Sequence, residues 1–178
     1  MRTKKIQSLL LALICLGLAV ACTFSQTPAA PSPTTAPPPQ PTPPPLTVQI
    51  VLIAREDNGQ SGDLIGCGDS AIPVQVTASS TQAPLVAALE ALLAVRDATY
   101  GESGLYNALH QSDLRVDSAA VAGGEATVHL SGTLLLGGVC DNPRVQAQLE
   151  GTVLRVPDVE SVAVYVNDTP LESILSER

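Results

Sequence analysis

The 178-residue chain contains no tryptophan, and aromatic residues make up only 2% of it. Its core must therefore be aliphatic, and a binding surface made of stacked aromatic rings is excluded. No lysine follows Lys5, which excludes lysine-based covalent chemistry from the rest of the chain. The later basic side chains are too few and too scattered to neutralise a run of phosphates, so no nucleic-acid partner is expected. They are Arg55, Arg96, Arg115, Arg144, Arg155 and Arg178.

Histidine is also scarce, because His110 and His129 are the only two. His129 and Ser131 lie two residues apart on a predicted strand, so they share a face. Neither a glycine-flanked nucleophile turn nor an oxyanion hole accompanies them, and a solvated sheet face is the simpler interpretation. Residues 57–63 resemble a calcium loop but lack the spacing and the closing glutamate of an EF-hand. The sequence therefore predicts no catalytic residues, no metal ligands and no cofactor.

The N-terminal residues 1–21 have the features of an export signal. Basic residues precede an apolar run that is too short for a comfortable membrane span, and small residues precede Cys22. The tetrapeptide Ala19-Val20-Ala21-Cys22 resembles the lipobox of bacterial lipoproteins, whose cysteine is acylated and becomes the new N-terminus. We predict a lipoprotein signal peptide over 1–21 and stable anchoring through lipid on Cys22. The alternative is a secretory peptide cleaved nearby, with Cys22 incidental.

Cleavage before Cys22 also changes the charge of the chain. It removes Arg2, Lys4 and Lys5 and no acidic residue, so the formal net charge of −8 becomes more negative by three units. Such an acidic protein gains nothing from electrostatic attraction to anionic lipid. Membrane attachment therefore depends on Cys22, and the predicted location is extracytoplasmic, on the bacterial cell membrane.

Residues 22–45 form a linker rich in proline, threonine, serine, alanine and glutamine. This composition cannot build a core, so we expect a disordered segment. Because proline fixes φ and removes N–H donors, the segment is expected to act as a semi-rigid stalk that spans roughly 50 Å when extended. The alternative is a proline-motif ligand for another protein.

Residues 46–178 are long enough for one hydrophobic core. Residues 48–53 are apolar on both faces, which predicts a central strand. A short second strand over 72–76 has a proline near its start, as is typical of a sheet edge. Residues 81–96 form a predicted helix that tolerates Pro84 in its first turn, and residues 105–109 are a candidate for one further helical turn.

The second half of this domain is patterned more clearly. Residues 114–121 and 126–131 alternate between apolar and polar side chains around two glycines, which predicts a β-hairpin. A helix is expected from Asp141-Asn142-Pro143 to residue 156, followed by a strand over 162–166. Because this helix crosses between two strands of one sheet, the predicted class is α+β. The predicted arrangement is a mixed sheet with two helices packed on one face, in the order β-β-α-β-β-α-β.

Two cysteines remain in the exported domain. An oxidising compartment favours pairing of Cys67 with Cys140, so we expect a disulfide between the polar loop 57–68 and the second helix. A reactive thiolate at Cys140 is the alternative, since a helix N-terminus lowers a thiol pKa. A zinc site is the weakest interpretation, because two cysteines and two distant histidines lack ligand spacing.

Several segments together resemble the GerMN domain family, named from sporulation and spore-germination proteins, over most of residues 46–178. The similar segments are APLVAALEALL (83–93), GEATVHLSG (124–132), AQLEGTVL (147–154) and VESVAVYVNDTPL (159–171). The chain has Asp168-Thr169 where the family usually has a glycine, and the cysteine pair is not general to the family. The resemblance implies a fold similar to the ring-building motifs of secretion and sporulation channels, a non-enzymatic role and no catalytic residues.

These observations predict a membrane-anchored, extracytoplasmic, non-enzymatic interaction or assembly module of the bacterial cell envelope. Its expected partners are the membrane, through Cys22, and an envelope protein or further copies of itself. The first alternative is a lipoprotein that binds a small ligand or solute, which requires a pocket with converging polar groups. The second is an enzyme that uses His129 and Ser131.

Overall fold

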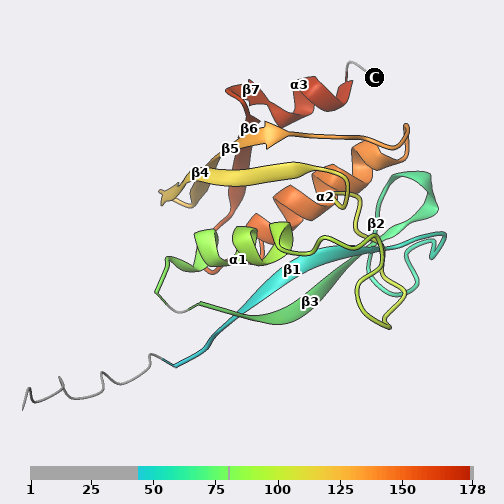
Figure 1. The fold of residues 1–178 in the computed structure, drawn as a ribbon, viewed down its shortest axis with the longest axis horizontal. Helices are drawn as coiled ribbons and strands as arrows, with labels where there is room; N and C mark the ends of the chain where they lie inside the picture. Colours follow the sequence, from blue (N-terminus) through green and yellow to red (C-terminus); the bar gives the residue numbers. More distant parts are fainter. Residues whose placement is uncertain (1–43, 80, 177–178) are drawn as a thin grey trace, which may run out of the picture. The chain divides into compact units, whose positions relative to one another are not determined.

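Two β-sheets enclose a pair of helices in this protein (Figure 1). The computed structural model describes residues 44–79 and 81–176, which all lie within one compact unit. The predicted signal peptide, Cys22 and almost all of the predicted linker lie outside the described residues. No helix in the described part of the chain is long and apolar enough to cross a membrane.

The first sheet has three strands in the order β1-β3-β2. β1 (Leu46–Ala54) and β3 (Ser70–Ala78) are antiparallel over their whole length, and β2 (Asp63–Leu64) pairs only with the start of β3. The sequence predicted a shorter second strand over 72–76. The longer strand is explained by its partner, since each of its residues is paired with a residue of β1.

The second sheet is mixed and has the order β4-β5-β6-β7. β4 (Asp113–Ala122) and β5 (Glu125–Thr133) form the predicted hairpin, whose turn places two glycines at φ 59° and 84°, which side chains rarely adopt. β6 (Ser161–Val166) runs parallel to β5. The short β7 (Thr169–Pro170) closes the sheet against β6.

Two main helices lie between the sheets. α1 (Pro84–Leu93) starts with proline in its first turn, as predicted. α2 (Asp141–Val153) is the crossover between β5 and β6. It ends three residues earlier than predicted because the chain tightens into i→i+3 turns at Arg155 and Val156. A short helix α3 (Leu171–Ser176) follows β7, and a 3-10 turn η1 (Gly66–Gly68) follows β2.

The hydrophobic core joins both helices to both sheets and is aliphatic, as the composition requires. The inward side chains of β5 and β6 meet one face of α1 and α2, and the inward side chains of β1 close the other side. The fully buried residues include Ile50, Leu52, Leu89, Leu92, Val128, Leu130, Val145 and Leu149. The α+β class and the mixed sheet with two helices on one face are thus confirmed, while the first two long strands form a separate sheet.

The prediction that residues 48–53 form a central strand is wrong. β1 lies at the end of its sheet, and its outer edge is covered by polar side chains of α2. The Val51 N–H donates to Thr152 Oγ1 at 2.9 Å, and the Val51 C=O accepts from Gln148 Nε2 at 3.3 Å. The helix thus takes the place of a neighbouring strand at this edge. Both faces of β1 are buried as well, and this burial misled the sequence prediction.

The predicted helical turn over 105–109 is also absent. Tyr106 is extended instead, and it exchanges two backbone hydrogen bonds with Ile53, of 3.0 and 2.7 Å. The next residue, Asn107, is fully buried and bonds to Gln148 at 3.1 Å. Pairing with β1 and this side-chain network therefore override the local helical preference.

A substitution at Thr152 tests whether its side chain satisfies the edge of β1. Thr152→Val keeps the shape of the side chain but leaves the buried Val51 N–H without its acceptor, so we expect the free energy of unfolding to fall by about 1–3 kcal/mol. Chemical denaturation measures this loss. The matched control is Thr77→Val at an exposed position of β3, for which a change within about 0.5 kcal/mol is expected. Equal effects of the two substitutions would contradict the edge-covering role.

Candidate functional site

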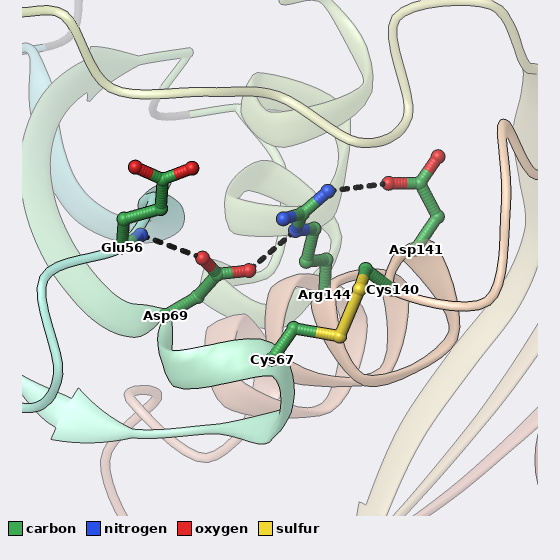
Figure 2. The surroundings of a disulfide bond; sticks show 6 residues. All are labelled: Glu56, Cys67, Asp69, Cys140, Asp141 and Arg144. Atoms are coloured by element: carbon green, nitrogen blue, oxygen red, sulfur yellow. Dashed lines mark hydrogen bonds and ion pairs between the residues drawn. A yellow bond between two sulfur atoms is a disulfide. The ribbon is translucent and has the colours of Figure 1, made fainter.

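A disulfide joins the polar loop before β3 to the start of α2 (Figure 2). It links Cys67 in η1 to Cys140, the residue that precedes α2, with 5.8 Å between their Cα atoms. This is the pair that the sequence predicts. Since the bond consumes both thiols, neither cysteine is a free thiolate in this state.

A buried ionic cluster lies directly beside the disulfide (Figure 2). The Asp69 side chain is 0% exposed and accepts hydrogen bonds from the Glu56 N–H at 2.8 Å and from Arg144 Nε at 2.5 Å. Asp141 accepts from Arg144 at 3.2 Å and from the Gly137 N–H at 2.7 Å. Every carboxylate oxygen of the pair therefore has a partner, as a buried polar network requires.

The charges of this cluster are compensated internally. Burial opposes the charge of Arg144, but hydrogen bonds to Asp69 and Asp141 outweigh burial and raise the pKa of the guanidinium above its ordinary value. Arg144 thus stays charged, and its role is to neutralise two carboxylates. Such a closed cluster braces the loop against the helix.

Tyr106 connects the ionic cluster to the surface. The guanidinium of Arg55 lies 4.8 Å from the centre of its ring, and that of Arg144 lies 5.4 Å from it, both within cation–π range. Burial, followed by the nearby Asp141 carboxylate, raises the pKa of the Tyr106 hydroxyl, while the two arginines oppose the rise. A surface hollow of ≈430 Å³ lies beside Tyr106 and Arg144 and is bordered by Gly137 and Gly138.

The structure gives His129 and Ser131 separate partners. The Ser131 hydroxyl donates to Asp117 Oδ1 at 2.6 Å. His129 stacks on Tyr165, with 4.9 Å between ring centres, and its Nδ1 lies 3.8 Å from Asp168. The Ser131 hydroxyl is thus directed to a carboxylate on β4, and this arrangement does not form the Ser–His pair of a nucleophilic enzyme.

The calcium-like loop is closed by its own hydroxyl groups. Asp57 accepts from the Ser61 N–H and hydroxyl at 2.7 and 2.9 Å and from the Ser70 hydroxyl at 2.6 Å. The Ser70 bond is the main cause of a lowered Asp57 pKa. Within residues 44–79 and 81–176, no cluster of three or more His, Cys, Asp or Glu residues is placed to bind a metal ion. Asp57 therefore organises the turn.

The fold and this site define a small α+β domain of two sheets and two enclosed helices, braced by a disulfide over a closed ionic cluster. The family model described as "Germane: Sporulation and spore germination" matches residues 59–172. The chain belongs to this family.

One solved structure of similar fold is that of the tandem GerMN domains of the sporulation protein GerM from Bacillus subtilis. It superposes with a TM-score of 0.51 at 18% sequence identity, over 76% of this chain and 43% of that one. This chain thus spans less than half of that structure, and the likeness concerns the fold. No curated protein matches this chain significantly.

Sequence reasoning found the disulfide but missed the ionic cluster beneath it. Asp69 and Arg144 are 75 residues apart, and neither stands in a recognisable motif. One usable signal was the spacing from the cysteines, since Asp69 follows Cys67 by two residues and Arg144 follows Cys140 by four. Once the disulfide is assumed, an acid and a base at these positions are brought close together.

The disulfide itself is expected to contribute strongly to stability. Replacing both cysteines with serine (Cys67→Ser with Cys140→Ser) opens a loop with a sequence separation of 73 residues. Chain entropy predicts a loss of about 4 kcal/mol in the free energy of unfolding. Denaturation of the oxidised and reduced wild type and of the double variant measures it. The reduced wild type and the variant should agree, and a stability insensitive to reductant would contradict the prediction.

Asp69 is expected to stabilise the fold independently of the disulfide. Asp69→Asn keeps the shape of the side chain but removes the charge that faces Arg144, so we expect a loss of roughly 2 kcal/mol in oxidised protein. The matched control is Asp63→Asn, which weakens an exposed ion pair with Arg155 and is expected to cost less than about 1 kcal/mol. Thermal or chemical denaturation measures the loss of stability in both variants. Equal losses would contradict the claim that the cluster stabilises the fold.

Proposed function

We propose that this protein is a membrane-anchored, extracytoplasmic, non-enzymatic interaction module of the bacterial cell envelope. The observation that carries the proposal is membership of the sporulation and spore-germination family. The site is consistent with it, because the buried charges beside the disulfide neutralise one another and Ser131 is bonded to a carboxylate. A domain with such a closed site is better suited to docking than to chemistry.

The anchor is proposed from the sequence. A lipobox at Cys22 supplies the lipid, and a proline-rich stalk separates the lipid from the folded domain. In this arrangement the domain extends away from the membrane surface and meets either an envelope protein or another copy of itself. The cell envelope is also the compartment in which the Cys67–Cys140 disulfide is stable.

A small-ligand-binding lipoprotein is the second candidate. The hollow beside Tyr106 and Arg144 favours it, because an aromatic ring and a guanidinium border the same space. Against it, Arg144 and Asp141 are already bonded to each other, so a polar ligand must compete with an existing ion pair. The interaction module therefore remains the better-supported function.

Membrane attachment can be tested at Cys22. Cys22→Ala removes the acylated thiol and is expected to move the full-length protein from the membrane fraction to the soluble fraction of the extracytoplasmic compartment. Cys15→Ala, a cysteine-to-alanine change within the same signal peptide, is the matched control and should stay on the membrane. Cell fractionation with an alkaline wash measures both. Membrane retention of the Cys22→Ala protein would show instead that the apolar segment remains as an uncleaved anchor.

A further inference from the structure

The free edges of the two sheets are protected to different degrees. A strand edge presents unpaired N–H and C=O groups that can bind another strand, and proteins usually block such edges. At Val51, the outer edge of β1 is blocked by Thr152 and Gln148 of α2. The Val51 backbone therefore faces away from β3, so its paired residue Pro73 faces the outer edge of β3. Proline has no N–H to offer there.

The two edges of the second sheet also differ. On the β6 side, the two-residue β7 contains Pro170 and leads into α3. On the other side, the ten-residue β4 is the edge strand, and no further strand of the described chain pairs with it. Its first half is protected by charged residues and by a bulge between Val116 and Ser118. Its second half, residues 118–122, contains no charge, no proline and no bulge.

The hydrogen-bond pattern of β5 shows which groups of β4 are free. The Leu130 C=O accepts from the Asn167 N–H, and the Gly124 C=O accepts from the Ser161 N–H. Even-numbered residues of β5 between these two therefore direct their backbone groups toward β6, and odd-numbered residues direct them toward β4.

In the second half of β4, two residues are consequently left facing the edge. Ser118 and Ala120 are paired with odd-numbered residues of β5, so their backbone groups point inward. Ala119 lies between these two residues and Val121 follows Ala120. Both direct their backbone N–H and C=O groups to the free edge. Val121 is also 42% exposed, which makes it an exposed large apolar residue at the same edge.

We propose that a second copy of this chain binds here, through antiparallel pairing of its own β4 with this β4. Ala119 of each copy lies opposite Val121 of the other, and Ala120 lies opposite Ala120 on the twofold axis. The inference rests on the proposed function, because two copies tethered to one membrane meet at a high effective concentration. It specifies the partner as the protein itself and places the contact at residues 118–122.

The register follows from the free backbone groups. Only this alignment pairs both edge-facing residues of one strand with both of the other, which gives four backbone hydrogen bonds between the copies. Neighbouring alignments bring the bulge at Asp117 or the Gly123 turn into a hydrogen-bonded position. Symmetric pairing of this kind is the isologous contact of a twofold dimer.

The side chains of residues 118–122 accept a second copy without a clash of charge. Serine, alanine and valine are small, and none is charged. Asp117 of one copy lies opposite Gly123 of the other, so the two Asp117 carboxylates stand at opposite ends of the contact. A pairing of five residues on each strand is small, and we therefore expect dimers on the membrane and mostly monomers in dilute solution.

Cysteine crosslinking in the membrane-borne, full-length protein tests the contact. In the proposed mature protein Cys22 carries the lipid, and Cys67 is bonded to Cys140, so an introduced cysteine is the free thiol. Cβ atoms of a non-hydrogen-bonded antiparallel pair are about 4.5–5.5 Å apart. Ala120→Cys should therefore form a disulfide-linked dimer on mild oxidation. Ala163→Cys, an alanine of β6 in the same sheet, is the control and should give roughly tenfold less dimer.

The register is tested by mixing two variants. Ser118 lies opposite Ala122 of the other copy, so tagged Ser118→Cys and Ala122→Cys chains should crosslink when they are expressed together and not when either is expressed alone. Equal yields for Ala120→Cys and Ala163→Cys, or a crosslink to a protein of different mass, would overturn the proposal. Membrane-bound variants that fail to crosslink refute the dimer and leave the anchoring intact, whereas variants found in the soluble fraction refute the anchoring on which the dimer depends.

Discussion

The structure depends on how the buried outer edge of β1 is satisfied. A strand that is apolar on both faces must bury its backbone, and every buried N–H and C=O needs a partner. Thr152 and Gln148 supply these partners from a helix, at 2.9 and 3.3 Å. Gln148 also accepts from the Ala108 N–H at 2.7 Å. One helix thus fixes β1 and the segment before β4 in a single hydrogen-bonded network.

This network explains why α2 occupies the centre of the domain. Along one face, Val145, Leu149 and Val153 pack into the core, while the adjacent polar positions bond to β1. At its N-terminus, Cys140 and Arg144 hold the loop before β3 by a disulfide and by the Asp69 ion pair. Covalent, ionic and hydrogen-bonded contacts therefore act on one element. The loop and the first sheet are positioned by the same helix that sets the order of the second sheet.

Local patterns were sufficient to predict elements whose neighbours are close in sequence. The hairpin around Gly123 and Gly124, the start of α2 and the crossover to β6 were predicted from alternation, from Pro143 and from helical spacing. The expected capping side chain was wrong, because Cys140 precedes α2 and no side chain caps it. The disulfide was predicted because a single cysteine pair remains after export.

Elements that depend on distant polar contacts could not be predicted in this way. β1 was placed at the centre of a sheet because a hydrophobic run indicates that a strand is buried but does not indicate which element covers it. The glutamine and threonine that cover its edge belong to residue types that are mostly exposed, and nothing local marks these two as buried. Tyr106 and Asn107 were placed in a helical turn for the same reason, since their partners Ile53 and Gln148 are far away in sequence. The Asp69–Arg144 pair was missed because its two residues are joined only by the fold.

The contrast between β1 and β4 connects the fold to the function. Family membership establishes a shared fold, and the solved structure of GerM domains is similar at only 18% identity, so surface properties must be argued from this chain's own residues. Here the fold commits buried polar side chains to close the β1 edge, where a substitution disturbs the core. The β4 edge has a bulge and charges only in its first half. In its second half, residues 118 and 120–122 are exposed and can change while the core is kept, whereas Ala119 packs against the core. A contact at the exposed residues of β4 can therefore be gained or lost without rebuilding the domain, which is the physical difference between this edge and that of β1.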